Sequence, residues 1–367
     1  MNSRHQHQHG VALVVVLWVV VILSLLIGGF AFSMYVETQV ASYARKELKA
    51  AALARSGVEL ARLQLLAHGK SAGESQYESL DQKWASNDSV YRDHELGDGH
   101  INITVTDEER RISVNQITEA RLRRLMRLLD MDMLAADTVT DSILDWITPG
   151  DLHRINGAKK DFYNRLPIPH GCKNAPLDRI EELLMIHGVT PELYNGTPAT
   201  TKHAARPGFK DLFTTAPTGG RINVNTASSM ILQAVLNIDA THANSIVEQR
   251  NGPDGIAGTD DDQPFHSVDE FLKLHGPVNT AEQQFWQSVI SVKSANFRII
   301  STGDIGGVKH TVTAILVRTT EDYTFASWNE SRTGQPEPEE LQSTQTTGKN
   351  ESPTRPKQVT SKQRRIT

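Results

Sequence analysis

The sequence predicts an α+β fold, in which a long N-terminal helix packs on a small antiparallel sheet and a large all-helical domain is inserted into that sheet. Three observations predict it. An apolar run near the N-terminus continues directly into an amphipathic helical pattern. Segments with the alternation typical of strands lie far apart in the chain. The stretch between those segments carries apolar residues at helical spacing.

The N-terminal helix is predicted from residues 11–68. Residues 11–36 carry no charge, and this run exceeds the about 20 helical residues that cross a bilayer. The chain then becomes amphipathic, rich in strong helix formers and free of proline. We therefore expect one continuous helix about 85 Å long, with one end in lipid and the other packed on a globular domain. Its apolar positions after the uncharged run are Val40, Tyr43, Leu48, Ala51, Val58, Ala61 and Leu65.

The sheet is predicted from three segments, 100–106, 291–302 and 308–319, the last two joined by a glycine-rich turn. Because an isolated hairpin is marginally stable, we expect all three in one antiparallel sheet packed on the N-terminal helix. Residues 69–111 and 288–322 then form the α+β domain around an inserted helical domain of residues 112–287. Residues 323–367 are poor in apolar side chains and are predicted to be disordered.

The insertion contains a two-part repeat. Residues 111–126 and 221–235 both begin Arg-Ile-x-Val-Asn and continue as a helix. Each is followed later by an acidic and apolar helix that ends in His-Gly, at 177–188 and 268–276. We therefore expect two related helical units, in which Asn115 and Asn225 cap the helices that follow them.

The first ten residues form a short polar leader that ends in Gly10 and contains Arg4 but no acid, which favours a cytoplasmic N-terminus. A cleaved secretory signal is the alternative, with residues 31–33 as its small-residue site. Two features argue against it. The apolar run is longer than the usual h-region, and the helical pattern continues past the position where cleavage would occur.

The leader ending in glycine, the apolar helix and its amphipathic extension together resemble type IV prepilins and pseudopilins. The resemblance implies that a prepilin peptidase cuts between Gly10 and Val11, and that the helix remains as membrane anchor and filament core. The sequence departs from the pattern at two positions. Val11 stands where phenylalanine is usual, and Val15 stands where a glutamate usually pairs with the terminal amine of the next subunit above.

The missing glutamate at Val15 indicates a subunit with no neighbour above it, because an unpaired carboxylate in lipid would cost several kcal/mol. The chain is therefore similar to the K-type minor pseudopilins of type II secretion systems, the general secretion pathway protein K family. That likeness implies a single-pass inner-membrane protein with a periplasmic globular part. Its implied partners are I- and J-type minor pseudopilins, the major pseudopilin, the inner-membrane secretion platform and prepilin peptidase. An ordinary single-pass anchor is the alternative.

The loop 250–265 carries four aspartates, Asp254, Asp260, Asp261 and Asp262, among three glycines. Carboxylate and carbonyl oxygens are the ligands that calcium prefers, although the spacing does not match an EF-hand. Adjacent aspartates repel one another unless a cation neutralises them. The resemblance to K-type pseudopilins, which bind calcium in the inserted domain, adds weight. We expect calcium here, with a solvated acidic loop as the alternative.

A second functional reading is a membrane-anchored helix-hairpin-helix receptor for DNA, which residues 222–278 also resemble. The corresponding turn, residues 236–240, lacks the glycines of such hairpins and places Asp239 where a phosphate would lie. Phosphate binding needs several basic contacts, and the net charge of the chain is −5. We therefore predict no nucleic-acid partner. The sequence also lacks the strong catalytic motifs, so no enzymatic activity is expected.

Overall fold

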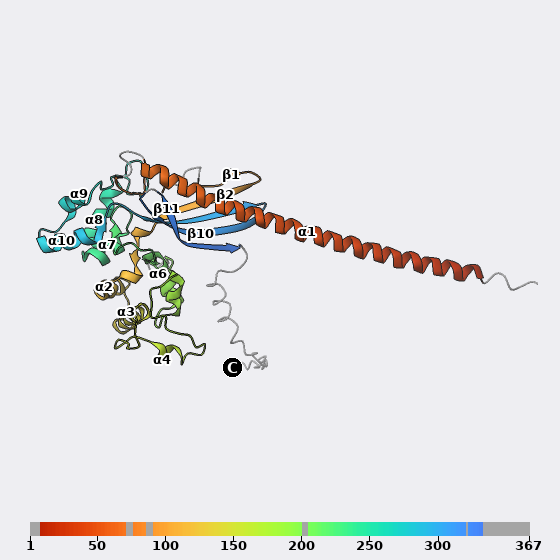
Figure 1. Ribbon diagram of the computed structural model, residues 1–367, viewed down its shortest axis with the longest axis horizontal. Coiled ribbons are helices and arrows are strands. Elements are labelled where there is room, and N and C mark those ends of the chain that lie inside the picture. Colours follow the sequence, from red (N-terminus) through yellow and green to blue (C-terminus); the bar gives the residue numbers. More distant parts are fainter. Residues whose placement is uncertain (1–7, 71–75, 86–90, 200–204, 321, 333–367) are drawn as a thin grey trace, which may run out of the picture.

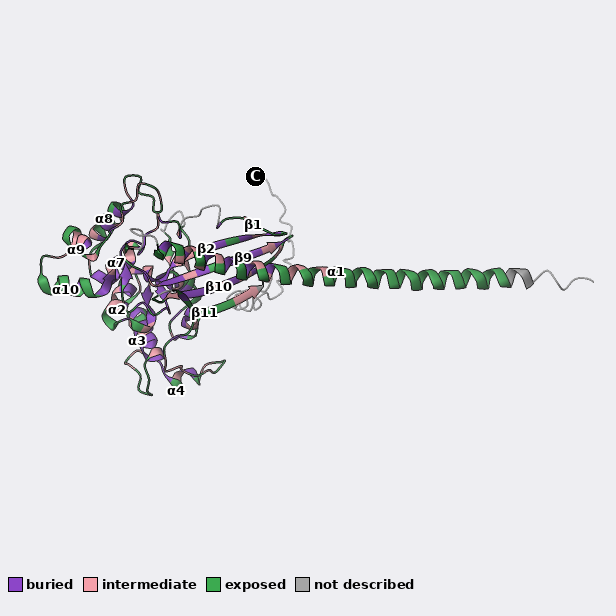
Figure 2. Ribbon diagram, turned by 45° about the horizontal axis from the view of Figure 1, so that its top comes forward, coloured by how far each residue is buried: buried purple, intermediate pink, exposed green. Residues whose placement is uncertain are grey.

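The computed structural model describes residues 8–70, 76–85, 91–199, 205–320 and 322–332. A single long helix, α1 (Gln8–Lys70), projects from a globular body made of the sheet and the inserted domain (Figure 1). The 63 residues of α1 confirm the predicted continuous helix, and its first turn contains Gly10 and Val11. Only the C-terminal part of α1 lies on the sheet, whereas the rest extends away from the body (Figure 2).

The sheet contains five antiparallel strands in the order β1-β2-β9-β10-β11. Their bounds are β1 His94–Leu96, β2 Gly99–Asp107, β9 Asn296–Ile305, β10 Val308–Arg318 and β11 Tyr323–Arg332. The predicted antiparallel sheet is thus confirmed, with β9 and β10 joined at Gly306 and Gly307, which both have the positive φ that glycine allows. The second predicted segment, 291–302, begins five residues too early, because 291–295 do not belong to this sheet.

The prediction that residues 323–367 are disordered is wrong for the first ten of them. Residues Tyr323–Arg332 form β11, which pairs with β10 from Tyr323 opposite Arg318 to Arg332 opposite His310. The polar composition concealed this strand, because its order comes from backbone pairing with β10 and from contacts with α1. Residues 333–367 lie outside the described part of the chain.

The contact between α1 and the sheet is a stripe of small and aliphatic side chains at steps of three and four residues. The fully buried members are Ala50, Ala54, Val58, Ala61 and Leu65. Gly303 of β9 permits a very close approach, since a Cβ there would lie 2.3 Å from the carbonyl oxygen of Ala50. This stripe confirms the predicted burial of Val58, Ala61 and Leu65.

Farther toward the N-terminus the predicted apolar stripe does not pack on the sheet. Val40, Tyr43 and Leu48 are exposed, although their spacing continues the same pattern. For Val40 and Tyr43 the reason is that the sheet does not extend along that part of α1 (Figure 1). Leu48 is only two residues before the buried Ala50, so it lies on a different face of the helix. The apolar surface of α1 therefore continues well beyond the globular body.

The inserted domain lies beyond the C-terminal end of α1 and to one side of the sheet, with its own apolar core (Figure 1). Its α-helices are α2 Glu119–Leu128, α3 Met133–Ile147, α4 Lys160–Tyr163, α5 Pro191–Asn195, α6 Phe209–Leu212, α7 Ser229–Leu236, α8 Ala240–Arg250, α9 Val268–His275 and α10 Thr280–Val289. It is mainly helical, as predicted, but not wholly so.

The departures from an all-helical insertion are short. The predicted helix at 177–188 contains the 3₁₀ helix η4 Ile180–Met185. Two further 3₁₀ turns, η2 Glu108–Arg110 and η3 Val114–Gln116, lie at the entry to the domain. Three ladders of two residues per strand join β3 Ile112–Ser113 with β6 Phe213–Thr214, β4 Gly196–Thr197 with β5 Arg206–Pro207, and β7 Ile222–Asn223 with β8 Ile290–Ser291.

The two copies of the Arg-Ile-x-Val-Asn motif adopt equivalent structures, but their asparagines do not cap the next helices. Thr118 and Ser228 are the N-caps of α2 and α7. The amide of Asn115 instead exchanges two hydrogen bonds with the backbone of Leu177, at 2.9 and 2.7 Å. The amide of Asn225 exchanges two with the backbone of Phe265, both at 2.9 Å. Each asparagine thus fastens its unit to the segment that leads to the later His-Gly element.

A cluster of buried carboxylates joins the sheet to the inserted domain. Asp107 accepts hydrogen bonds from Thr226 Oγ1 at 2.6 Å and Ser294 Oγ at 2.7 Å, so it links the entry and return segments. Glu109 accepts from the backbone N–H of Ala295 at 2.9 Å. Burial, with the charge of Asp107 beside it, raises the pKa of Glu109 to about 9. This cluster fixes where the inserted domain sits relative to α1.

Candidate assembly surface and acidic loop

The N-terminal part of α1 presents an exposed apolar surface. No charged residue lies between Gln8 and Val36, and the large side chains from Leu13 to Leu48 are exposed in the described structure. Among the described residues, α1 is the one helix long and apolar enough to cross a membrane. Val15 lies on this surface with 55% of its area exposed. Such a surface needs lipid or neighbouring helices to cover it.

The C-terminal part of α1 is joined to β11 by two ion pairs. Arg55 donates from Nε and Nη2 to the two carboxylate oxygens of Glu330, at 2.9 and 2.8 Å. Arg62 Nη1 donates to Asp322 at 2.7 Å, just before β11 begins. Both ends of β11 are therefore attached to the helix. The two ion pairs therefore hold β11 beside this part of α1.

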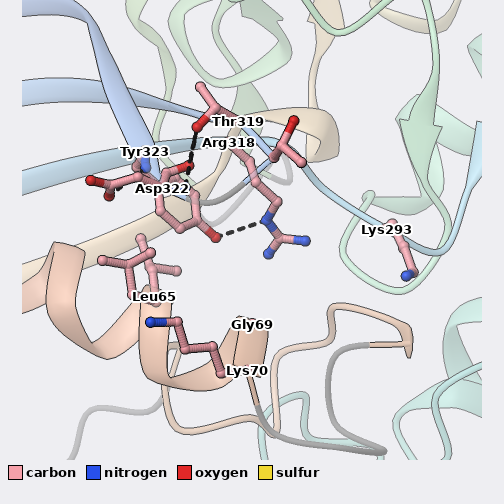
Figure 3. Close-up of a pocket in the computed structure, with 10 residues that line it drawn as sticks. Leu65, Gly69, Lys70, Lys293, Arg318, Thr319, Asp322 and Tyr323 are labelled. Atoms are coloured by element: carbon pink, nitrogen blue, oxygen red, sulfur yellow. Dashed lines mark hydrogen bonds between the residues drawn. The ribbon is translucent and has the colours of Figure 1, made fainter.

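A cavity of about 510 Å³ lies where α1 ends against the β10–β11 turn (Figure 3). Arg318 points into it and donates from Nε to the hydroxyl of Tyr323 at 2.9 Å, while its Nη2 lies 2.7 Å from Glu78. Lys70 and Lys293 stand at its rim (Figure 3). The buried Arg318–Glu78 pair ties the sheet to the segment that follows α1. Among the described lining residues there is no nucleophile paired with a base.

The four aspartates predicted to bind calcium lie in the loop between α8 and α9. The carboxylates of Asp254, Asp261 and Asp262 each accept hydrogen bonds within the loop. Asp254 accepts from the N–H of Ile256 at 2.7 Å, Asp261 from the N–H of Asp254 at 3.1 Å, and Asp262 from the N–H of Gly258 at 2.7 Å. Asp260 is exposed and takes no part in these bonds.

The loop supplies the right donor atoms for calcium but does not present them as a closed site. Across the described residues, no group of three or more Asp, Glu, His or Cys side chains is arranged to hold a metal ion. The carboxylates are engaged by N–H and hydroxyl groups of the loop itself. Burial raises the pKa of Asp262, and the charge of Asp81 raises it further. Calcium binding at this loop stays a prediction.

The turn that would contact DNA in the alternative reading has the features expected from its sequence. Asn237 closes α7 in the left-handed conformation, with φ of 61°. Asp239 then caps α8, accepting from the N–H of His242 at 2.8 Å. Since this carboxylate occupies the helix N-terminus, the position at which a phosphate could bind is already taken by an anion.

Sequence reasoning missed two features of these surfaces. Asp81 is about 180 residues from the acidic loop in the sequence and reaches it only because Leu80 packs on the loop. A Cβ at Gly258 would lie 3.2 Å from the carbonyl oxygen of Leu80. The second feature is β11 with its aromatic residues Phe325 and Trp328. The alternation of Tyr323 and Phe325 was the only local signal for that strand.

Comparisons with known proteins point to one family. Two family models, both described as type II secretion system protein K, match residues 99–198 and 222–293. Type II secretion system protein K of Pseudomonas aeruginosa is 24% identical over 325 residues, covering 85% of this chain and 89% of that protein. The corresponding protein of Pectobacterium carotovorum is 32% identical over 72 residues, which is 20% of this chain and 22% of that protein.

A solved structure shares the fold. It is the crystal structure of the GspK–GspI–GspJ complex from the type 2 secretion system of enterotoxigenic Escherichia coli. The matched chain superimposes with a TM-score of 0.62 and 22% identity, over 80% of this chain and 99% of that one. The α+β fold is therefore shared over four-fifths of this chain. The structure thus shows a shared fold, and the sequence matches, all described as type II secretion system protein K, support placing the chain in that family.

Proposed function

We propose that this chain forms the tip of a type II secretion pseudopilus and helps to initiate its assembly for the export of folded proteins across the outer membrane. It would act by assembly, with no reaction of its own. The observation that carries this proposal is that α1 is long and apolar at one end and bears a bulky domain at the other. Each part of that combination argues for the tip separately.

The first argument is electrostatic. α1 offers an uncharged surface from Gln8 to Val36, with Val15 where a mid-filament subunit would carry an acid for the amine of the subunit above. A subunit at the tip has no such amine to neutralise, so an apolar side chain is the better choice there.

The second argument is steric. The inserted domain, from β3 to α10, lies past the C-terminal end of α1 and beside the sheet (Figure 1). Another subunit stacked above along the axis of α1 would have to occupy the same space. The domain therefore suits a position with subunits below it and none above.

The partners follow from this position. We propose that the chain assembles with I- and J-type minor pseudopilins through α1, and that this complex then contacts the major pseudopilin and the inner-membrane platform. Prepilin peptidase would cut between Gly10 and Val11, and α1 would cross the inner membrane once, with its N-terminus in the cytoplasm and the body in the periplasm.

We also propose that the acidic loop binds calcium. Asp254, Asp261 and Asp262 would hold the ion once their carboxylates turn from the loop N–H groups, and Asp81 is the nearest further acid. Calcium there would neutralise adjacent negative charges and stiffen the loop between α8 and α9. It would contribute to stability rather than to catalysis.

Labelling of assembled pseudopili tests the tip assignment. Cells that overproduce the major pseudopilin would carry this chain with an epitope after its last residue, and sheared pseudopili would be labelled with gold particles. Label at one end of each filament is the expected result. Label along the length would contradict the tip assignment. The DNA-receptor alternative would instead require the purified chain to retain duplex DNA at moderate salt, which the capping carboxylate of Asp239 opposes.

A further inference from the structure

The outer side of β11 is a free sheet edge in the described part of the structure. β11 lies last in the strand order and pairs only with β10, so the outward-facing N–H and C=O groups of its ten residues have no strand beside them. The opposite edge is formed by β1, which has only three residues. Short edge strands are one way in which proteins avoid unwanted pairing, and β11 does not use it.

β11 carries few of the other protections of an edge. It contains no lysine and no proline. The protections it has are one irregularity in its pairing with β10, at Ala326, and one acid, Glu330, which pairs with Arg55. Its exposed side chains include Phe325 and Trp328, which are 43% and 38% exposed and contact each other edge to face at 5.1 Å. An exposed aromatic pair beside unpaired backbone groups is typical of a surface that another chain covers.

This edge is held in place rather than frayed. Arg62 binds Asp322 at one end of β11 and Arg55 binds Glu330 near the other. The indole N–H of Trp328 donates to Glu330 at 2.8 Å, which fixes the ring against the same ion pair. The edge is thus attached at both ends to the flank of α1, which is part of the proposed assembly surface.

We propose that β11 accepts an edge strand from the sheet of a second, different pseudopilin in the same filament. The added strand would hydrogen-bond along Tyr323–Arg332 and place apolar side chains on Phe325 and Trp328. This inference rests on the proposed assembly function and names the surface that one neighbour uses. We infer this neighbour because a subunit whose long helix packs beside α1 brings its own sheet next to β11.

A second copy of this chain fits the role poorly. Pairing two β11 edges about a twofold axis perpendicular to the sheet makes the strands antiparallel and points the two α1 helices in opposite directions. A twofold axis along the strands keeps the helices parallel but puts them on opposite faces of the joined sheet. Head-to-tail pairing of β11 with β1 of another copy keeps the helices parallel on one face, but β1 offers only three residues to the ten of β11. A different subunit that presents a longer edge is therefore the better occupant.

Photocrosslinking in cells tests the proposal. The full chain, coexpressed with I- and J-type pseudopilins, would carry a photoreactive amino acid at Ser327 on β11 or, as a matched control, at Glu95 on the β1 edge. Both positions are exposed on edge strands. The expected result is a crosslink from Ser327 to one of these pseudopilins, identified by mass spectrometry, and none from Glu95. Protection of the 323–332 amides from hydrogen exchange in the purified complex would accompany it.

The other outcomes separate the two proposals. If the pseudopilins copurify with the chain but Ser327 gives no crosslink and 323–332 gains no protection, the edge inference is wrong and the assembly function stands. A crosslink between two copies of this chain would also overturn it. If the pseudopilins do not copurify at all, both proposals fail together.

Side-chain substitutions give an independent readout. Replacing both Phe325→Ala and Trp328→Ala should weaken the complex by about tenfold or more, as truncation of buried aromatic anchors commonly does. Phe285→Ala is the matched control, since Phe285 of α10 is 41% exposed and lies in the inserted domain. An unchanged melting temperature of the unbound double variant shows that folding is intact. Equal affinity of the double variant and the control would contradict the proposal.

Discussion

Arg55 of α1 and Glu330 of β11 form a two-pronged ion pair, with Nε and Nη2 of the arginine donating to separate carboxylate oxygens at 2.9 and 2.8 Å. The pair joins residues 275 positions apart in the sequence and connects α1 to β11, the last strand of the sheet. His310 also contacts Glu330, at 3.2 Å. β11, which was not predicted from the sequence, is thus attached to α1, which was.

Replacing Glu330→Gln should loosen β11 while lowering the free energy of unfolding by less than about 1 kcal/mol, because more than half of the Arg55 side chain is exposed. The hydrogen bond from Arg55 lowers the pKa of Glu330 to about 2. The stability that this ion pair contributes is therefore fully present above pH 4.5, the ordinary pKa, and is lost as the pH falls through about 2. Hydrogen exchange of residues 323–332 should be faster in the variant at pH 7.

The difference in stability between Glu330→Gln and the unchanged protein should accordingly become smaller as the pH falls toward 2. Glu95→Gln, an exposed glutamate on the opposite edge strand, is the control and should change nothing at either pH. If residues 323–332 exchange at the same rate in Glu330→Gln and in the unchanged protein at pH 7, the Arg55–Glu330 pair does not hold β11.

Stability should fall in alkali because of Glu109. Burial, together with the neighbouring Asp107 charge, raises its pKa from 4.5 to about 9, so the folded protein holds a proton there that the unfolded chain releases. The stabilising contribution is complete below pH 4.5 and declines until the pH has passed about 9. The melting temperature should therefore decrease between pH 7 and pH 10, and Glu109→Gln should flatten that decrease. Glu248→Gln, an exposed control, should leave the slope unchanged.

Introducing a carboxylate into the apolar part of α1 should impair the protein. Val15→Glu places an unpartnered acid on the uncharged surface near one end of the apolar run, at a cost of less than the about 3 kcal/mol of a charge at the centre of a membrane helix. Secretion by a strain that relies on this variant should fall well below that of Val15→Leu, which keeps the surface apolar. Equal secretion by the two variants would mean that Val15 carries no information about position in the filament.

Calcium should raise the melting temperature of the full chain in detergent. Binding at a concentration of 100 times Kd adds about 2.7 kcal/mol to the free energy of unfolding. The double substitution Asp261→Asn and Asp262→Asn should abolish the shift, whereas Asp269→Asn on α9 should not. Magnesium at the same concentration should have a much smaller effect, because the flexible loop suits the larger ion. A shift that persists in the double variant would place the calcium site elsewhere, and no shift in the unchanged protein would contradict calcium binding.

The elements with strong local patterns were predictable from sequence. α1 and the pairing of β9 with β10 follow from an uninterrupted helical period and from alternation around two glycines. The helices of the insertion follow from the same logic. Even there, the stretch from Ile180 to Met185 becomes a 3₁₀ helix although its apolar spacing suggests an α-helix.

What escaped prediction depends on contacts between distant segments. Asn115 and Asn225 precede helices and look like caps, yet Thr118 and Ser228 take that role, which leaves the asparagine amides free to bind the backbones of Leu177 and Phe265. No local pattern encodes those partners. The ordering of β11 and the approach of Asp81 to the acidic loop are of the same kind.

The central claim is that α1 survives processing as anchor and assembly element. The position of the mature N-terminus tests this claim most directly. Intact-mass analysis of the protein purified from membranes should give a chain that begins at Val11, and Gly10→Val should leave residues 1–10 attached. A mature chain that begins beyond Ser33 would remove most of the apolar surface of α1 and would contradict the account.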